Sequence, residues 1–281
     1  MAAANTGALA GNGVRLHYRI KGEGPLLLLL AGGAGDAESF DTIVDKLVDH
    51  FTILTYDRRG LSRSATEVRT ESLCLEIHSD DVHRLLRHLT NEPVLVLGTS
   101  IGALIGLDLV ARCPEQVRCL IAHEPIAPEL LQDPERTQAV RDEFDIEEAY
   151  RRDGVPAAMK KFLEVARINF EDREPDAELP QSTPERARNL EFFLSHDAPA
   201  VRQYRLAFPS LMARSAKIIP AAGETSADAW QHHCAQALAN LLGREMMTFP
   251  GGHAGITSHP KGFAARVIRA FRDSGHADDH P

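Results

Sequence analysis

The amino-acid sequence predicts an α/β fold, in which helices flank a mostly parallel central sheet. Short apolar runs alternate with longer segments of helical periodicity along most of the chain, which is the pattern of strands and helices that follow one another in turn. The chain has 281 residues, of which 43% are hydrophobic, and this length is sufficient for one such core domain with an inserted cap.

Apolar runs of strand length mark the expected strands. The run 26–31 holds five consecutive leucines. It is far shorter than the roughly 20 residues that cross a bilayer, so it indicates a buried strand and no membrane span. The expected strands are 14–20, 26–31, 51–56, 94–97, 117–122, 217–222 and 245–249. The expected helices are 37–47, 73–89, 103–112, 229–241 and 262–271.

One stretch, 126–210, breaks this alternation. It contains no run typical of a strand, and its charged helical patterns are separated by prolines. Because the stretch lies between two expected strands, we expect it to form a helical cap (lid) over the carboxyl ends of the sheet, where open α/β sheets bind ligands. Residues 1–125 and 211–281 would then form the core. A helical subdomain without contact to the substrate is the alternative.

The charge balance excludes some classes of partner. Lys and Arg total 31 against 40 Asp and Glu, and the net charge of -9 argues against nucleic acid or an anionic membrane as the main partner. The first 13 residues are small and polar, without the basic region and apolar run of an export signal. We therefore expect a cytoplasmic protein that acts on a small molecule, with a homodimer left open.

The cysteines and histidines do not form a recognisable metal motif. The four cysteines show neither a CxxC pair nor ligand spacing with histidine, so we interpret them as reduced structural thiols. The nearest approach to a cluster is His232-His233-Cys234, but adjacent residues on a helix point to different faces. The sequence predicts no metal site and no cofactor.

The most informative motif is a strand, a sharp turn and a helix around Gly98-Thr99-Ser100-Ile101-Gly102. Such a corner strains the backbone at the nucleophile and leaves no room for side chains two residues before and after it, which explains both glycines. A helix that begins at Ile101 also aims free N–H groups and a positive dipole end at this point. We expect Ser100 to be a nucleophile and the Ile101 N–H to be an oxyanion donor. A purely structural turn is the alternative.

A serine hydroxyl needs a base within hydrogen-bond reach, and His253 is the candidate. It lies in Phe249-Pro-Gly-Gly-His253, directly after the last expected strand, where a glycine-flanked loop can return the imidazole to the sheet edge. Three other histidines, His78, His83 and His88, fall within one helical pattern and are expected at the surface.

The third member should be a carboxylate between Ser100 and His253 in the chain. The loop after the strand 217–222 carries Ser226 where an aspartate is usual, with Glu224 and Asp228 nearby. Glu124, at the end of the strand 117–122, is the other choice and the one we favour. Its alternative role is that of a hinge residue for the cap.

Glycines after the leucine strand offer a second oxyanion donor. Ala31-Gly32-Gly33-Ala34-Gly35 presents backbone N–H groups without obstruction, so Gly33 or Ala34 would supply it. A dinucleotide-binding loop is disfavoured because no G-x-G-x-x-G follows. Farther along, we interpret 56–62 as a structural turn with Gly60 at a positive backbone angle, and not as a catalytic site for Asp57.

Together these motifs resemble the α/β-hydrolase family across nearly the whole chain. More narrowly, the chain resembles the zearalenone lactonase group in 122–125, which holds Glu124, in 249–253 and 258–260, and at Gly33. That resemblance implies ester or lactone hydrolysis without a cofactor, a glutamate as the acid and Gly33 as oxyanion donor. The chain departs from the group around Ser100 and in the cap, so the lactone substrate is not carried over.

The sequence therefore predicts a serine hydrolase that cleaves an ester or lactone through an acyl-enzyme. Ser100 would attack, His253 would move the proton, and Glu124 would orient the imidazole. A C–C bond hydrolase or a haloperoxidase-like enzyme on the same triad is an alternative. A ligand receptor with slow turnover on a hydrolase scaffold is another.

Overall fold

The computed structural model describes residues 5–64, 66 and 73–275, and it has the predicted α/β architecture. The sheet in this part of the chain has eight strands in the order β1-β2-β4-β3-β5-β6-β7-β8. Neighbours from β4 to β8 are parallel, whereas β1 with β2 and β2 with β4 are antiparallel. The strands are β1 Asn5–Gly11, β2 Val14–Lys21, β3 Leu26–Leu30, β4 Thr52–Tyr56, β5 Val94–Thr99, β6 Val117–His123, β7 Ile218–Gly223 and β8 Met247–Phe249.

Strand β1 was not predicted. Its sequence NTGALAG lacks an apolar alternation, and most of its residues are exposed. It pairs with β2 along its whole length at the edge of the sheet. Backbone hydrogen bonds therefore hold this strand in place, and such bonds leave little trace in a sequence of small residues.

The helices flank the sheet and fill the segment between β6 and β7. Those that pack on the core are α1 Asp41–Leu47, α2 Leu75–Leu89, α3 Ile101–Arg112, α9 Trp230–Leu242, α10 Gly255–Ser258 and α11 Pro260–Asp273. Those between β6 and β7 are α4 Glu135–Asp153, α5 Val155–Val165, α6 Pro184–Phe192, α7 Ala198–Gln203 and α8 Phe208–Met212. Short 3₁₀ turns lie at Ala37–Phe40, Pro114–Gln116, Pro128–Leu130 and Ser215–Lys217.

The leucines of β3 divide between two apolar cores, one on each face of the sheet. Leu28 and Leu30 pack in the cluster that includes α2, α3 and α9, and Leu27 and Leu29 pack in the cluster that includes α1 and α11. All four are at most 1% exposed. A parallel strand covered on both faces reads as an unbroken apolar run, which is why the periodicity of 26–31 is so uniform.

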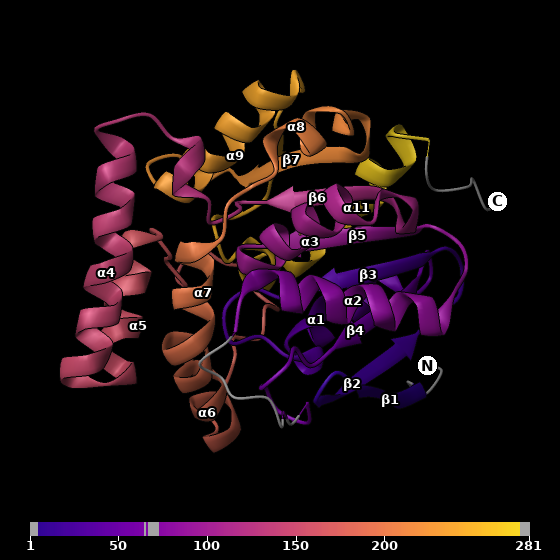
Figure 1. Cartoon of the computed structure of the whole chain (residues 1–281), viewed down its shortest axis with the longest axis horizontal. Helices are drawn as coiled ribbons and strands as arrows, with labels where there is room; N and C mark the ends of the chain where they lie inside the picture. Colours follow the sequence, from indigo (N-terminus) through magenta and orange to yellow (C-terminus); the bar gives the residue numbers. More distant parts are fainter. Residues whose placement is uncertain (1–4, 65, 67–72, 276–281) are drawn as a thin grey trace.

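We refer to residues 126–210 as the cap. Figure 1 places α4, α5, α6 and α7 beyond the carboxyl ends of the parallel strands, whereas α8 returns to the core. There α8 packs against α3 and α9. That this segment acts as a lid stays a prediction. Among the described residues, no helix is both long and apolar enough to cross a membrane.

His123, the last residue of β6, is a buried histidine without a polar partner. Its ring packs edge-on against Phe249 and Phe263, with centroids 5.8 and 5.3 Å away. Neither ring nitrogen has a hydrogen-bond partner in the described structure. Burial lowers the pKa of His123 from 6.5 to about 4, so the ring is neutral in the folded protein at neutral pH.

This burial makes the stability of the fold depend on pH. Between pH 6.5 and about 4 the unfolded chain binds a proton at His123 and the folded chain does not, so stability is lost as pH falls through this window. We expect His123→Phe to keep the ring contacts and remove the titration. Its stability relative to the wild type should then be about 2 kcal/mol more favourable at pH 5 than at pH 7.5, measured by urea unfolding.

Replacement of an exposed histidine provides the control for this measurement. His88 is exposed on α2, and His88→Gln should leave the dependence of stability on pH unchanged. If His123→Phe and the wild type lost stability in parallel as the pH fell, the interpretation of His123 as a neutral buried ring would be wrong.

Candidate active site

The carboxyl ends of four parallel strands bring the predicted residues to one edge of the sheet. Thr99 at the end of β5 lies opposite His123 of β6, and His123 lies opposite Ala221 of β7. Ser100 and Glu124 are the next residues of their strands, so the pairing places them at neighbouring positions. The N–H of Ser100 donates to the carbonyl of His123 at 3.0 Å, which ties the two strand ends together directly.

Ser100 occupies the strained corner that the sequence predicts. Its backbone angles are φ 57° and ψ -123°, and its hydroxyl does not cap α3. A Cβ at Gly98 would lie 2.5 Å from the carbonyl oxygen of Gly102, and one at Gly102 would lie 2.1 Å from that of Leu30. Both glycines are therefore required by backbone that approaches closely, as the motif implies.

Glu124 and His253 meet in the interior. The Nδ1 of His253 lies 2.7 Å from Oε2 of Glu124, and both side chains are buried. The other carboxylate oxygen accepts the Gly223 N–H at 2.8 Å and a short hydrogen bond from the Ser226 hydroxyl. Burial alone would raise the pKa of Glu124, but the hydrogen bond and charge of His253 lower it to about 2.

This ionisation state fixes the tautomer of the imidazole. An ionised carboxylate only accepts hydrogen bonds, so Nδ1 of His253 carries the proton towards Glu124. Nε2 is then left with a free lone pair when the ring is neutral, as a general base requires. The ring also packs edge-on against Phe162 of α5, with centroids 5.9 Å apart.

The other acid candidates lie elsewhere. Glu224 and Asp228 are exposed, and no hydrogen bond in the described structure joins either of them to His253. Ser226 is buried and donates to Glu124. Sequence reasoning noticed Ser226 as the residue in place of the usual aspartate but did not assign it a contact. A hydroxyl group at the position of the usual aspartate was the signal in the sequence that Ser226 could donate a hydrogen bond to an acid from another strand.

The glycine loop lies beside the serine. A Cβ on Gly32 would lie 3.1 Å from the Cβ of Ser100, and Gly33 has φ 31°. Within the described residues, no hydrogen bond uses the N–H of Gly33 or of Ala34. Ile101 is the first residue of α3, where N–H groups lack partners within the helix. Unused donors therefore exist at every position that the sequence singled out.

The segment 56–62 is a structural turn, as predicted, although it does more than turn the chain. Gly60 has φ 83°. The carboxylate of Asp57 is buried and accepts the N–H groups of Ala37 at 2.9 Å and Arg63 at 3.0 Å. The next residue, Arg58, points towards the glycine loop and the cap.

The prediction for one of the three surface histidines is wrong. His88 is exposed and His83 is half-buried, but His78 is 1% exposed and lies 3.1 Å from a carboxylate oxygen of Asp197 in the cap. The helical periodicity correctly places His78 on one helix with His83 and His88. It does not show that the cap, far along the chain, covers His78.

A cavity of about 370 Å³ lies between the core and the cap. The core contributes Leu104, one helical turn after Ser100, and the cap contributes the other lining residues, beginning with Ile126, two residues after Glu124. The cap contributes charged side chains, among them Glu143, whose pKa is raised to about 7 by burial. The lining of the cavity thus combines apolar with charged side chains.

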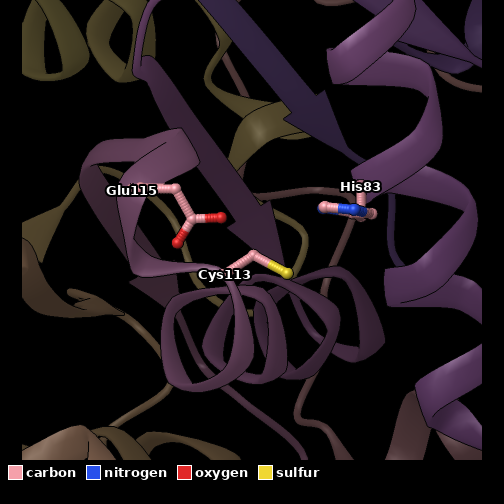
Figure 2. A group of neighbouring side chains, drawn as sticks. All are labelled: His83, Cys113 and Glu115. Carbon is pink, nitrogen blue, oxygen red and sulfur yellow. The ribbon is translucent and has the colours of Figure 1, made fainter.

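One group of side chains in the described part of the chain could hold a metal ion. His83, Cys113 and Glu115 have ligand atoms within 4.8 Å of one another, and Figure 2 shows them around a common space. Thiolate, imidazole and carboxylate are ligands of Zn²⁺. Cys113 follows α3 at the end opposite Ser100, so this group is separate from the candidate active site.

The segment His232-His233-Cys234, considered in the sequence, is used in other contacts. Both ring nitrogens of His233 have partners, Glu135 for Nδ1 and the carbonyl of Ala227 for Nε2 at 2.7 Å. The Cys234 thiol donates to the carbonyl of Ala127 at 3.3 Å.

Comparisons with known proteins agree with this architecture. Residues 25–230 match the model of the alpha/beta hydrolase fold family. The uncharacterized hydrolase YraK of Bacillus subtilis is 38% identical over 267 residues, which cover 94% of each chain.

Two solved structures share the fold at lower identity. An alpha/beta hydrolase from Sphaerobacter thermophilus has a TM-score of 0.69 and 22% identity, and covers 94% of this chain and 100% of its own. A thermophilic esterase from Thermogutta terrifontis has a TM-score of 0.66 and 18% identity, and covers 97% of each chain. The sheet topology, the match over residues 25–230 and the similarity to YraK lead to one conclusion: the chain belongs to the alpha/beta hydrolase fold family.

Proposed function

We propose that this chain is a serine hydrolase that cleaves a carboxylic ester or a lactone through an acyl-enzyme, with Ser100, His253 and Glu124 as its triad. The observation that carries the proposal is the buried hydrogen bond of 2.7 Å between His253 and Glu124. It lies at the sheet edge where Ser100 stands in a strained corner. Nucleophile, base and orienting acid follow the ends of three different strands, β5, β8 and β6, and have the residue types that the triad chemistry uses.

The geometry supports a two-step reaction. Ser100 Oγ attacks the carbonyl carbon while Nε2 of His253 accepts the hydroxyl proton, and Glu124 stabilises the imidazolium that forms. The imidazolium then returns the proton to the leaving alkoxide, which departs as an alcohol. A water molecule attacks the acyl-enzyme with His253 again acting as base, and the products are a carboxylic acid and free Ser100.

Negative charge on the carbonyl oxygen needs two donors during both steps. The N–H of Ile101 is one, favoured by the dipole at the start of α3. The N–H of Gly33 or of Ala34 is the other, on the loop that contacts Ser100. Donors fixed before the reaction stabilise the transition state more than the ground state, because the charge on this oxygen develops only in the transition state.

The proposal includes lactones beside esters because of the residues around the acid and the base, without carrying over the particular lactone of any group. The segments 122–125 and 249–253 resemble the zearalenone lactonase group, whose acid is a glutamate. The apolar part of the cavity lining, which includes Leu104 one helical turn after Ser100, is suited to the acyl part of a small ester or lactone.

Replacement of the nucleophile tests the proposal. We expect Ser100→Ala to lower kcat for p-nitrophenyl butyrate by a factor on the order of 10⁴ or more, because no acyl-enzyme can form. The control is Ser182→Ala, which changes an exposed cap serine and should keep the wild-type rate. Equal rates for Ser100→Ala and the wild type would remove Ser100 from the mechanism.

The assignment of the acid is tested by three variants. Glu124→Gln keeps the shape of the side chain but loses the charge that orients the imidazole, so kcat should fall by about 10³–10⁴-fold. Glu224→Ala and Asp228→Ala alter exposed side chains and should stay within about threefold of the wild type. An inactive Asp228→Ala beside an active Glu124→Gln would contradict the assignment.

A further inference from the structure

The side chain of Arg58 joins the glycine loop to the cap. Its guanidinium donates to the carbonyl of Ala31 at 3.4 Å and, through a short hydrogen bond, to that of Gly33. The same group donates twice to one carboxylate oxygen of Asp197, at 3.1 Å from Nε and 2.6 Å from Nη2. Arg58 follows β4 in the core, whereas Asp197 lies in the cap, 139 residues later in the chain.

Asp197 is buried as an ion with two partners. It ends a single turn of π-helix, Phe193–Asp197, between α6 and α7, and its side chain is 0% exposed. Its second carboxylate oxygen lies 3.1 Å from Nε2 of His78 on α2. Burial opposes ionisation, but the charges of Arg58 and His78 outweigh it and hold the pKa of Asp197 below its ordinary value. A π-helical turn with a buried charge is uncommon in a segment that only covers a core.

The peptide that Arg58 holds contains one of the two candidate oxyanion donors. In a planar trans peptide the C=O and the N–H point in opposite directions. The carbonyl of Gly33 points to Arg58, so the N–H of Ala34, which belongs to the same peptide, points away from Arg58. Rotation of this peptide would break its hydrogen bond to a buried guanidinium, which has a high cost in the interior.

The cap also lies against this region through the side chains of Phe192, Phe193 and Asn189. A Cβ placed on Gly33 would lie 4.0 Å from the ring of Phe193, and one placed on Gly60 would lie 2.0 Å from the ring of Phe192. On α6, Asn189 exchanges two hydrogen bonds with Ser62, one at 2.9 Å and one at 2.8 Å. The part of the cap that carries Asp197 is thus fixed on the turn that carries Arg58.

We propose that Asp197 is a positioning residue for the oxyanion hole, which acts through Arg58 to hold the glycine loop, and with it the candidate donors of Gly33 and Ala34, beside Ser100. The cap segment around Asp197 is then part of the catalytic apparatus, although it does not touch the reacting atoms. This inference rests on the proposed serine-hydrolase function.

The chain offers a matched control for the experiment. Arg59, the next residue, forms a second buried ion pair with Asp81 of α2, with two hydrogen bonds of 2.8 Å. The exposed fractions of the side chains are 3% and 1%, against 3% and 0% for Arg58 and Asp197. Arg59 reaches the carbonyl of Asn12 and not the glycine loop. Asp81→Asn therefore removes a similar ion pair without disturbing the peptide in question.

The kinetic test compares Asp197→Asn with Asp81→Asn. Loss of one oxyanion donor lowers kcat by about 10²–10³-fold in known enzymes, so a donor that is misplaced part of the time should lower it by about 10–100-fold. We expect Asp197→Asn to show this fall in kcat for p-nitrophenyl butyrate with little change in KM. Phenylboronic acid, whose tetrahedral adduct with Ser100 mimics the transition state, should bind less tightly by a similar factor. Asp81→Asn should stay within about threefold in both.

Two further measurements separate positioning from folding and from the proposed function. The double variant Arg58→Met with Asp197→Leu replaces the ion pair by apolar groups and should keep a folded protein while kcat stays low. NMR order parameters of the Gly33 and Ala34 amides should fall in Asp197→Asn and not in Asp81→Asn. This measurement does not depend on which substrate the enzyme hydrolyses.

The outcomes are distinct. If wild-type protein turned over no ester or lactone, the proposed function would fail, and the order parameters would still decide whether Asp197 positions the loop. If the wild type were active but Asp197→Asn and Asp81→Asn lowered kcat equally, the role assigned to Asp197 would be overturned. The same holds if the affinity of Asp197→Asn for phenylboronic acid stayed unchanged, as KM does, while its kcat fell. Unchanged order parameters in Asp197→Asn would overturn it as well.

Discussion

The buried carboxylate of Glu124 is the group on which the geometry of the candidate site depends. It binds the imidazole of His253, the N–H of Gly223 and the hydroxyl of Ser226, so it connects the ends of β6 and β7 with the loop after β8. A buried ion without such donors would be strongly unfavourable, and each donor is also a positional restraint. The electrostatic requirement of one side chain therefore orders three segments of chain, and the strand register adds Ser100 to them.

The parts of the site that are local in sequence could be predicted. The corner at Ser100 needs glycines at fixed offsets, because backbone from β3 passes within contact distance of Gly102. Glu124 could be favoured because a strand end supplied an acid, whereas the later loop has Ser226 at the position where an aspartate is usual. The uniform burial of β3 and the parallel order of the sheet likewise follow from apolar runs of strand length.

The parts that depend on distant contacts could not be predicted. Strand β1 has no apolar alternation and is held by its partner β2. Arg58 and Asp197 read as ordinary charged residues in a turn and in a polar helical region, because their pairing across 139 residues leaves no mark in either segment. His78 was misplaced for the same reason. Charged residues are rarely buried, so the burial of Arg58 and Asp197 becomes visible only once the cap is packed on the core.

The contacts of α6 and of Asp197, just before α7, with the core divide the cap into two parts, an anchored part and the hairpin of α4 and α5. The sequence of the second part is less restricted by contacts with the core. The hairpin of α4 and α5 reaches the anchored part through a hydrogen bond of 2.8 Å between Tyr150 and Ser195 and an ion pair between Glu147 and Arg202. Its helix α4 supplies four residues to the cavity lining, Arg136, Val140, Glu143 and Phe144, and the hairpin contains none of the residues that hold the glycine loop. Changes to the lining residues of α4 would therefore alter substrate preference while the residues that hold the glycine loop stay as they are, whereas an exchange of α5 would also remove Phe162 from the ring of His253.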